Sequence, residues 1–260
     1  MLVTSWNILH AMPIPPSGSG NFGDALKRLG SDVAGFQEVD HHLARSSNEP
    51  QMQIAAQSLG AAYWAFAPSL IGTPGEVRRH LNGSDERIIS NGSMNKVGSY
   101  GIGIVSRIPV IKWERLELGR SFLGLPLLIP AEKGVRAIYV NDEERVALAA
   151  HLDNGWIVIN TPLSFVPFVN LYQLGKVKRW AKTLSQGGKY KVLIIGDLNL
   201  PKNFSGWNSL ITQKSYPSWG AKVQFDYILS NTLDANQIEV LPTSVTGVSD
   251  HLPISVRINT

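Results

Sequence analysis

Continuous apolar runs of strand length limit most strongly how this chain can fold. The clearest run is VLII at residues 192–195, which leads through a glycine into the polar stretch DLN at residues 197–199. A strand with one face in water alternates apolar and polar residues, whereas a strand that is covered on both faces can be apolar throughout. Because many of the runs do not alternate, we expect a sheet that lies between other layers of the fold.

These runs and the patterns between them predict an α/β fold with at least one large sheet. The predicted strands are residues 2–8, 33–39, 63–67, 100–106, 136–140, 146–151, 156–161, 191–196, 225–229 and 252–258. The predicted helices are residues 24–29, 51–59 and 171–184. Long loops are expected over residues 11–21, 68–99 and 118–134, where proline, glycine or serine interrupts the patterns. No internal repeat or linker-like boundary divides the sequence, so we expect one domain over residues 1–260.

The composition excludes several classes of protein. The chain has no cysteine, which rules out disulfides, thiolate nucleophiles and zinc sites with cysteine ligands. The formal net charge of +4 permits an anionic substrate, but the lysines and arginines form no block of the kind that marks nucleic-acid-binding proteins. No apolar run approaches the roughly 20 residues that span a bilayer, and the first residues do not read as a signal peptide. We expect a cytoplasmic monomer without a transmembrane segment.

Polar side chains stand at the ends of several predicted strands. Asp197 and Asn199 are two residues apart, so on an extended chain they point the same way, and an unpaired carboxylate there would be costly. Oxygen ligands suit a hard cation such as Mg²⁺, and an aspartate beside a histidine suggests proton transfer. Any one of these residues could simply form a turn, so the joint pattern carries the hypothesis. The set is Asn7, Glu38, Asp197, Asn199, Asp226, Asp250 and His251.

The motifs around these residues resemble, in order, those of the endonuclease/exonuclease/phosphatase superfamily. This superfamily includes pancreatic-type deoxyribonucleases, abasic-site endonucleases, neutral sphingomyelinases and inositol-polyphosphate 5-phosphatases. The resemblance spans residues 3–258 and implies a four-layer α/β sandwich, in which two mixed β-sheets pack face to face between outer helices. The motifs are SWNILH, FQEVD, SYGIGIVSRIP at 99–109, IGDLN at 195–199, FDYIL at 225–229 and SDHLPI at 249–254.

The resemblance also implies a metal site. Glu38 would be the principal ligand of Mg²⁺ or Mn²⁺, with Asn7 and Asp250 close by. The implied activity is hydrolysis of a phosphate ester, and we expect a diester rather than a monoester. A nucleic acid, a phospholipid headgroup or a nucleotide-like metabolite would each fit the modest positive charge.

The remaining site residues take catalytic roles under the same resemblance. Asp197 and Asn199 would hold the attacking water or the phosphate, and His251 would act as general base or phosphate ligand. Asp226 would accept the other ring N–H of His251 and so fix its tautomer. Among nearby aromatic residues, Trp6, Tyr216 and Trp219 could stack on a base or sugar, although such side chains mostly pack in cores.

One departure from the family pattern concerns a strand-end histidine that contacts the phosphate in many members. The matching stretch here is INTPLSF, and Pro162 stands where the histidine would be. Proline can neither donate nor accept a hydrogen bond through its side chain. His10 and His151 are possible substitutes. The alternative to an active enzyme is therefore a binding protein of the same fold with weakened or lost turnover.

Overall fold

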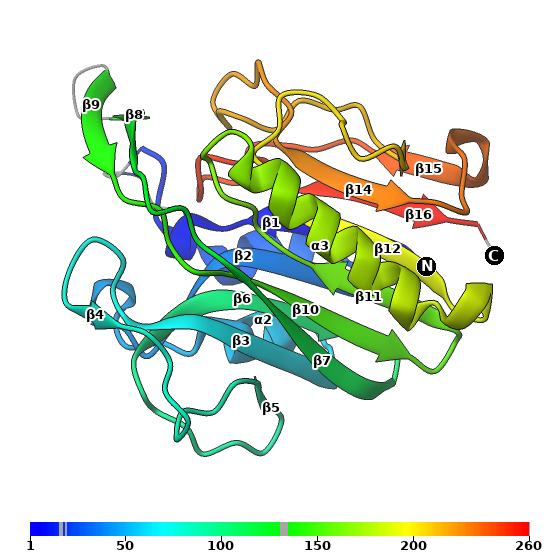
Figure 1. The fold of residues 1–260 in the computed structure, drawn as a ribbon, viewed down its shortest axis with the longest axis horizontal. Coiled ribbons are helices and arrows are strands. Elements are labelled where there is room, and N and C mark those ends of the chain that lie inside the picture. The colour runs from blue at the N-terminus through cyan, green and yellow to red at the C-terminus, as the bar shows by residue number, and fades with distance from the viewer. Residues whose placement is uncertain (16–17, 19, 131–134, 260) are drawn as a thin grey trace.

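Two mixed β-sheets pack face to face at the centre of the fold, with helices on their outer faces (Figure 1). The description rests on a computed structural model and covers residues 1–15, 18, 20–130 and 135–259. The α/β sandwich expected from the sequence is confirmed. No helix in this part of the chain is long and apolar enough to cross a membrane.

The first sheet has the strand order β15-β16-β1-β2-β6-β3-β4, with β5 also paired to β3. Strand β1 runs parallel to β2 and antiparallel to β16, so the two ends of the chain meet in neighbouring strands. The amino group of Met1 donates to the carbonyl oxygen of Ile258 at 2.9 Å. The strands are β1 (Leu2–Asn7), β2 (Val33–His41), β3 (Tyr63–Gly72), β4 (Arg78–Arg79), β5 (Ile89–Ser90), β6 (Ser99–Ser106), β15 (Ile238–Leu241) and β16 (Ile254–Ile258).

The second sheet has the order β13-β14-β12-β11-β10-β7, and a separate ribbon pairs β8 with β9. Strands β11 and β12 are parallel, and each is antiparallel to its other neighbour, β10 or β14. The strands are β7 (Val110–Gly119), β8 (Leu125–Pro130), β9 (Val135–Val140), β10 (Arg145–Leu152), β11 (Trp156–Asn160), β12 (Lys191–Asp197), β13 (Asn208–Ser209) and β14 (Asp226–Ser230).

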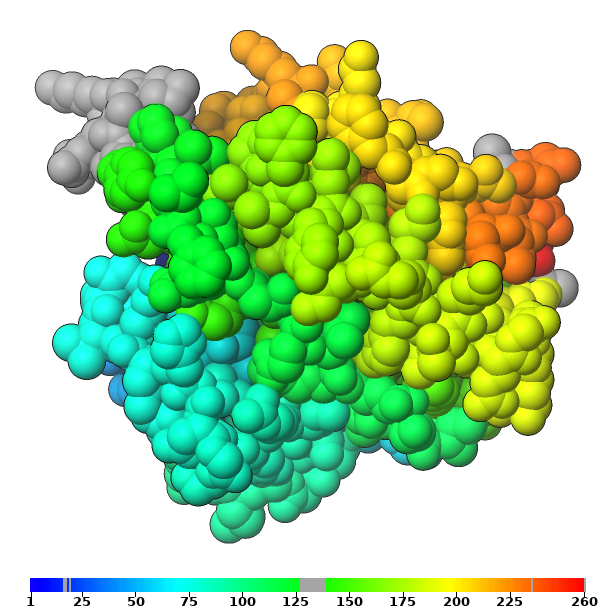
Figure 2. Space-filling view, in the orientation of Figure 1, coloured from blue at the N-terminus to red at the C-terminus, as the bar shows by residue number. Residues whose placement is uncertain are grey.

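Helices cover the outer face of each sheet. Apolar side chains of α1 and α2 pack against the first sheet, and those of α3 pack against the second. In the space-filling view of Figure 2, α3 (yellow-green) covers much of the second sheet. This layering explains why the central strands are apolar on both faces. The helices are α1 (Phe22–Leu29), α2 (Gln51–Leu59) and α3 (Val169–Leu184), with 3₁₀ turns η1 (Leu9–Ala11), η2 (Ala44–Ser46), η3 (Gln186–Gly188) and η4 (Ala235–Gln237).

A polar contact joins the two sheets inside their otherwise apolar interface. Asn160, at the end of β11, is fully buried, and its side-chain oxygen accepts a hydrogen bond from Gln37 Nε2 of β2 at 2.6 Å. The Asn160 amide donates to the carbonyl oxygens of Phe36 at 2.8 Å and Gly103 at 2.9 Å. Since buried polar groups are costly unless they are paired, these bonds fix how the sheets align.

Two of the three expected loops contain strands, so those expectations were wrong in part. Residues 118–134 include β8, whose two prolines we took as interruptions, and residues 68–99 include the end of β3 together with β4 and β5. Proline is tolerated on a strand that is paired on one side only, and β8 pairs with β9 alone in the described part of the chain. Strand β7 was also missed, because charged residues interrupt its apolar pattern.

Candidate active site

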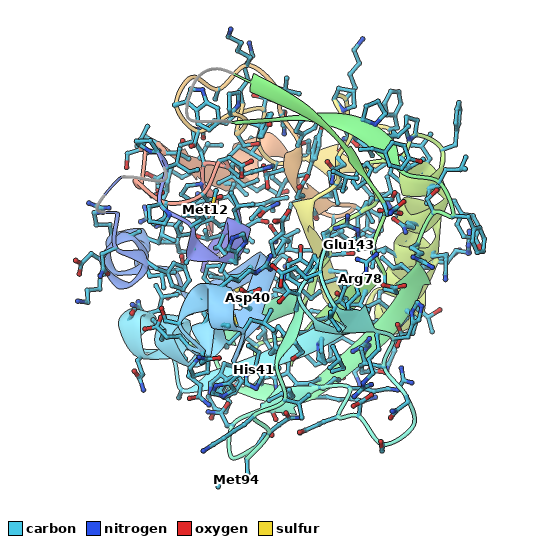
Figure 3. All side chains as sticks on the ribbon, turned by 90° about the vertical axis from the view of Figure 1, so that its left-hand side faces the viewer. Met12, Asp40, His41, Arg78, Met94 and Glu143 are labelled. Atoms are coloured by element: carbon cyan, nitrogen blue, oxygen red, sulfur yellow. The ribbon has the colours of Figure 1, made fainter. Side chains whose placement is uncertain are left out.

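The strand topology gathers the polar strand ends at one end of the sandwich. Asn7 ends β1, and Glu38 lies near the end of β2, which is parallel to β1. Asp197 ends β12 of the second sheet and lies opposite Asp226, the first residue of β14. This end lies on the left in Figure 1, away from the two chain termini, and faces the viewer in Figure 3. The site therefore forms where the two sheets meet.

The Asn7 side chain connects carboxylates from the two sheets. Its amide nitrogen donates to Glu38 Oε1 at 2.9 Å and to Asp197 Oδ2 at 3.1 Å. Its side-chain oxygen accepts a hydrogen bond from the backbone N–H of Leu9 at 3.1 Å. Glu38 and Asp197, which are far apart in sequence and belong to different sheets, thus face one point.

The backbone at Glu38 adopts an unusual conformation. Its φ angle is 56°, and the pairing of β2 with β6 shifts register between Phe36 and Val39. A β-bulge of this kind redirects a side chain, and a positive φ in a residue other than glycine is uncommon and costs energy. Asn199 and Ser249, which flank other site residues, also have positive φ angles of 49° and 64°. Such strain is typical of functional sites.

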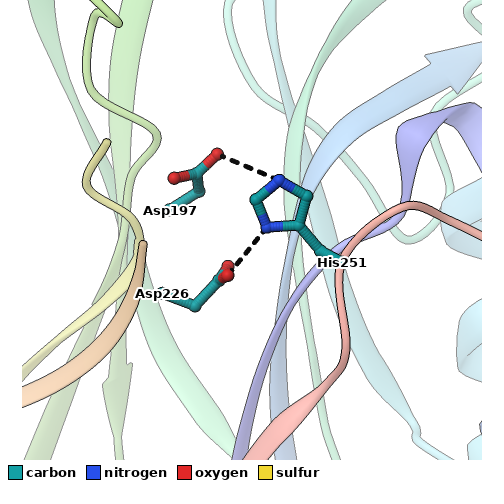
Figure 4. A group of neighbouring side chains, drawn as sticks. All are labelled: Asp197, Asp226 and His251. Carbon is teal, nitrogen blue, oxygen red and sulfur yellow. Dashed lines mark hydrogen bonds and ion pairs between the residues drawn. The ribbon is translucent and has the colours of Figure 1, made fainter. Parts of the chain in front are cut away.

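Asp226, His251 and Asp197 form an aligned group (Figure 4). His251 Nδ1 and Asp226 Oδ2 are 2.7 Å apart, and His251 Nε2 lies 3.9 Å from Asp197 Oδ2. A carboxylate at Nδ1 accepts a hydrogen bond from the N–H of that nitrogen, which leaves Nε2 directed at Asp197. The distance of 3.9 Å is too long for a hydrogen bond but suits one oxygen atom that contacts both groups.

The main chain around His251 is fixed by further hydrogen bonds. Trp6 Nε1 donates to the carbonyl oxygen of His251 at 3.0 Å, and the backbone N–H of His251 donates to Ser249 Oγ at 3.0 Å. Ser249 Oγ in turn donates to the carbonyl oxygen of Asn7 at 2.6 Å. The loop before β16 is therefore tied to the end of β1, and the imidazole is held in place.

Burial and neighbouring charges shift the pKa values of the site residues. Burial lowers the pKa of His251, but the carboxylates of Asp226 and Asp197 outweigh it and raise that pKa to about 10. Burial, opposed by the charge of His251, raises the pKa of Asp197 to about 7. Burial likewise raises the pKa of Asp250 to about 6, and the negative charge of Glu38 adds to this effect. The site thus concentrates negative charge that a cation would relieve.

Two groups of side chains could hold a cation. The carboxylate oxygens of Asp197 and Asp226 and a ring nitrogen of His251 lie within 4.8 Å of one another. In that group, however, a hydrogen bond already occupies Asp226 Oδ2 and His251 Nδ1. In the second group, Glu38 and Asp250 offer carboxylate oxygens, the donor type that Mg²⁺ prefers, and the charge of Glu38 acts on Asp250. The Asn7 oxygen of this group accepts a hydrogen bond from Leu9, and the Asn7 amide nitrogen faces Glu38. The predicted Mg²⁺ or Mn²⁺ site thus draws its free oxygen donors from Glu38 and Asp250.

Pro162 lies directly beside this site. It follows β11 and is buried, and the next residue, Leu163, accepts a hydrogen bond from Asn199 Nδ2 at 3.0 Å. The backbone N–H of Asn199 donates to Asp197 Oδ1 at 3.0 Å. The predicted role of Asn199 near the attacking water thus becomes, in this structure, a turn that orients Asp197 and connects it to the Pro162 segment.

His151 does not replace the missing histidine. His151 lies opposite Ile157 in the β10–β11 ladder. Ile157 is five residues before Pro162, which corresponds to about 16 Å along a strand. His151 Nε2 lies 2.9 Å from Glu114 Oε1 instead. His10 is a different case, because burial and the charge of Arg45 lower its pKa, while the charges of Asp40 and Glu38 raise it.

The three aromatic residues considered for stacking differ in burial and in their neighbours. Trp6 is fully buried, and its ring lies 6.0 Å from that of Phe22, so it packs in the core as most such side chains do. The Tyr216 ring lies 5.0 Å from the His251 ring, and Trp219 is 52% exposed. Tyr216 therefore remains a candidate for contact with the substrate.

Sequence reasoning missed a group of charged residues beside Glu38. Their signal was the run NDEER at residues 141–145, directly before a strand. Figure 3 shows Asp40, Arg78 and Glu143 near the middle of the face that carries the site. The charge of Glu38 acts on the buried residues of the group, raising the pKa of Glu143 further after burial. The group comprises Asp40, Arg45, Arg78, Tyr100, Asp142, Glu143 and Arg145.

Comparison with models of protein families matches residues 4–251 to the Endonuclease/Exonuclease/phosphatase family. The chain belongs to this family. The match covers nearly the whole sequence and confirms the resemblance drawn from the motifs. Members of the endonuclease/exonuclease/phosphatase family are phosphoesterases.

Solved structures of the family share this fold at low sequence identity. A mannosyl-6-phosphatase of Bacteroides thetaiotaomicron has a TM-score of 0.61 and 14% identity, with 100% of both chains covered. A family protein of Beutenbergia cavernae has a TM-score of 0.59 and 17% identity over 100% of this chain and 72% of that one. The human Nocturnin catalytic domain, solved with a bound sulfate anion, has a TM-score of 0.55 and 16% identity over 100% of this chain and 93% of that one. A search of curated protein sequences found no match.

Proposed function

We propose that this protein is a divalent-metal-dependent phosphoesterase that hydrolyses a phosphodiester by attack of water. The arrangement that carries the proposal is the Asp226–His251 pair directed at Asp197, beside the Asn7 amide that joins Asp197 to Glu38. It places a proton-transfer pair and an oxygen-rich cation site around one point. Family membership supplies the reaction class, and these residues supply its chemistry.

Asn7, Glu38 and Asp250 would hold Mg²⁺ or Mn²⁺. When bound, the cation would neutralise charge on the phosphate and stabilise the leaving oxygen. The two carboxylates and the Asn7 amide come from β1, β2 and the loop before β16, all within the first sheet and its connections. Two of the donors are thus held by neighbouring strands, which favours a precise site.

Asp197 and His251 would carry out the proton transfer. A water between Asp197 Oδ2 and His251 Nε2, which are 3.9 Å apart, can give its proton to Asp197 as it attacks phosphorus. His251 contacts a phosphate oxygen through Nε2, and Asp226 keeps the ring in that orientation through Nδ1. The turn at Asn199 holds Asp197 for the reaction through its backbone N–H.

A diester fits the charge of this site better than a monoester. Four carboxylates (Glu38, Asp197, Asp226 and Asp250) surround the position, and their Coulomb interactions with a phosphate are repulsive. A diester carries one negative charge, whereas a monoester carries nearly two at neutral pH. The natural diester could belong to a nucleic acid, a phospholipid headgroup or a nucleotide-like metabolite.

Hydrolysis of two nitrophenyl esters tests the proposal. Bis-p-nitrophenyl phosphate and p-nitrophenyl phosphate would be offered to the protein with Mg²⁺, Mn²⁺ or a chelator. We expect turnover of the diester to exceed that of the monoester and to stop in the chelator. Turnover that persists in the chelator would contradict the metal requirement. Absence of turnover for both esters, with metal binding shown by calorimetry, would favour a silent binding protein.

A further inference from the structure

We propose that Arg145 contacts the substrate phosphate and supplies the hydrogen-bond donor that Pro162 cannot. This inference rests on the proposed phosphoester hydrolysis and adds a catalytic residue to it. The observations that carry it are the position of Arg145 beside Pro162, its burial with few partners, and the groups that hold and face it.

Arg145 lies next to Pro162 across two neighbouring strands. Strand β10 is antiparallel to β11 with Leu148 opposite Asn160, so the same register brings Val146 opposite Pro162. Thr161 Oγ1 donates to the carbonyl oxygen of Val146 at 3.2 Å, which shows that the two segments stay adjacent beyond the end of β11. Arg145 is the next residue along β10.

Neighbouring charges place the Arg145 guanidinium at the strand end that carries the site. Arg145 is the first residue of β10, before the alanines Ala147 and Ala149 that pack under α3. The ladder with β7 is irregular here, with Arg145 opposite Gly119 and Val146 opposite Glu117, so the extra residue, Leu118, lies on β7. The charges of Glu143, Tyr100 and Glu38 act on the guanidinium, which therefore lies on the side of the first sheet.

The guanidinium is buried with most of its donors unpaired. Its side chain is 8% exposed, and within the described part of the chain it donates one long hydrogen bond, from Nη2 to Asp142 Oδ1 at 3.4 Å, while Nε has no partner. A guanidinium has five N–H donors, and unpaired buried donors are costly. Arg115, equally buried in the same sheet, donates to the carbonyl oxygens of Pro68 and Arg87 at 2.7 Å and pairs with the Glu117 carboxylate at 3.0 Å, although its Nε also has no partner. Arg145 thus has donors free for an anion.

Asp142 holds Arg145 in this position. Its Oδ2 accepts hydrogen bonds from the backbone N–H of Ser121 at 2.6 Å and from Ser164 Oγ at 2.8 Å. Ser164 lies two residues after Pro162, so Asp142 connects the arginine to the proline segment. Burial lowers the pKa of Arg145, but Glu143, Tyr100 and Asp142 raise it more, and the group stays charged.

Other basic residues near the site are less suited to this role. Arg45 makes a bidentate pair with Asp40, at 2.8 Å and 2.7 Å. Arg78 is directed at Glu143, with Nη1 at 3.7 Å from its carboxylate. His10 lies in η1 beside Arg45 and Asp40, on the first sheet, and burial lowers its pKa. Arg145 is the charged donor that adjoins Pro162.

Arginine in this role alters the reaction in one respect. The bond from the water oxygen to phosphorus forms, the bond to the leaving oxygen breaks, and the water proton passes to Asp197. Arg145 stabilises negative charge on the phosphate and leaving oxygens but cannot give up a proton. The leaving oxygen therefore departs as an anion and takes its proton from solvent. Esters with acidic leaving groups should consequently be hydrolysed far faster than alkyl esters.

The test compares Arg145→Met and Arg145→Lys with Arg115→Met as a matched buried control. Kinetics would be measured on aryl methyl phosphates whose leaving groups span a range of pKa, with Mg²⁺ binding by calorimetry and melting temperature beside them. We expect Arg145→Met to lower kcat by about 10²–10³-fold, the cost of one transition-state donor. The kcat of Arg145→Met should depend more steeply on the pKa of the leaving group, and added guanidinium chloride should partly restore it. Its affinity for Mg²⁺ should be unchanged. The kcat of Arg145→Lys should lie between those of Arg145→Met and wild type, whereas Arg115→Met should change the melting temperature more than the leaving-group dependence.

Two results would overturn the proposal. The first is a folded Arg145→Met protein that hydrolyses alkyl-like esters within about threefold of wild type, since one lost donor should cost far more. The second is loss of activity in His10→Gln with no loss in Arg145→Lys or Arg145→Met. If Arg145→Met fails to fold, Asp142→Asn and Arg145→Lys serve in its place, because both keep a positive charge there.

A separate measurement distinguishes failure of this inference from failure of the proposed function. Binding of inorganic phosphate to the Mg²⁺-loaded protein by calorimetry needs no turnover. If wild type hydrolyses no ester, the proposed function fails, but tenfold or greater weakening of phosphate binding in Arg145→Met would still support the phosphate contact. Equal phosphate affinity in wild type and Arg145→Met would refute it.

Discussion

Replacing Asp226 by asparagine tests the proton-transfer group with almost no change in shape. The carboxylate is fully buried, and its Oδ2 lies 2.7 Å from His251 Nδ1. Asparagine removes the negative charge that raises the pKa of His251, so the ring more readily loses the form in which both nitrogens carry a proton. The orientation of the ring, with Nε2 facing Asp197, would then rest on a weaker neutral contact at Nδ1.

The expected loss can be estimated from this one contact. A hydrogen bond to a charged group contributes about 1.5–3 kcal/mol and a neutral one about 0.5–1.5 kcal/mol, so the exchange costs about 1–2 kcal/mol. That cost alone lowers the rate by roughly 5–30-fold. Loss of the doubly protonated His251 ring adds to it, and we expect a total loss of about 10²-fold or more, the scale of lost acid–base help.

Stability should change little in the same variant. Asp226 lies directly opposite Asp197 in the β12–β14 ladder, and like charges in that position are destabilising. Removing one charge relieves this repulsion and offsets part of the weakened bond to His251. Activity should therefore fall while the melting temperature in chelator stays near that of wild type.

The assay is kcat for bis-p-nitrophenyl phosphate with saturating Mg²⁺, measured for Asp226→Asn, His251→Gln and the double variant. Asp24→Asn is the matched control, because the Asp24 side chain is 66% exposed and pairs with Lys27. If Asp226 acts through His251, replacing Asp226 should lower kcat little further once His251 has been replaced, since the effects of coupled residues are not additive. A rate within threefold of wild type, or full additivity in the double variant, would refute the reasoning.

Three further predictions concern other parts of the site and the fold. Glu38→Gln should abolish divalent-cation binding in calorimetry while the circular dichroism spectrum is unchanged, and undiminished binding would exclude Glu38 as the main ligand. Pro162→His should raise the rate mainly on esters with poor leaving groups, and more so in an Arg145→Met background. A melting-temperature measurement must show that the strand end is intact. No gain in either background would contradict the proposal that the site lacks a donor at Pro162. Asn160→Ala removes three buried hydrogen bonds between the sheets and should lower the free energy of unfolding in urea by about 3 kcal/mol, at about 1 kcal/mol per bond; a loss below 1 kcal/mol would show that the sheets align without them.

The sequence predicted the central strands because their signal is local and strong. The apolar run at residues 192–195 needs cover on both faces, and β12 forms there with its predicted polar end at Asp197. The positions of Glu38 and Asp226 beside that end followed from the order of family motifs. Strand β8 failed because its prolines are allowed on an edge, which depends on pairing that the sequence does not display.

The charged group around Arg145 could not be predicted for a different reason. A run such as NDEER usually marks a solvated turn, whereas in this fold Arg145 is buried and pairs with Asp142. The conformation of Glu38 is equally hidden from the sequence, since a positive φ inside a strand depends on the register between β2 and β6. In both cases the deciding feature arises from tertiary structure.

The pairing of β1 with β16 determines when the proposed site can first form during synthesis. Asn7 is made among the first residues, but β1 lacks its antiparallel neighbour until residues 254–258 have left the ribosome. His251 and Asp250 also come late, and the loop that carries them is tied to Asn7 and Trp6. The earlier strands can therefore pair with one another during synthesis, whereas the proposed site forms only after the strand that follows His251 has been made.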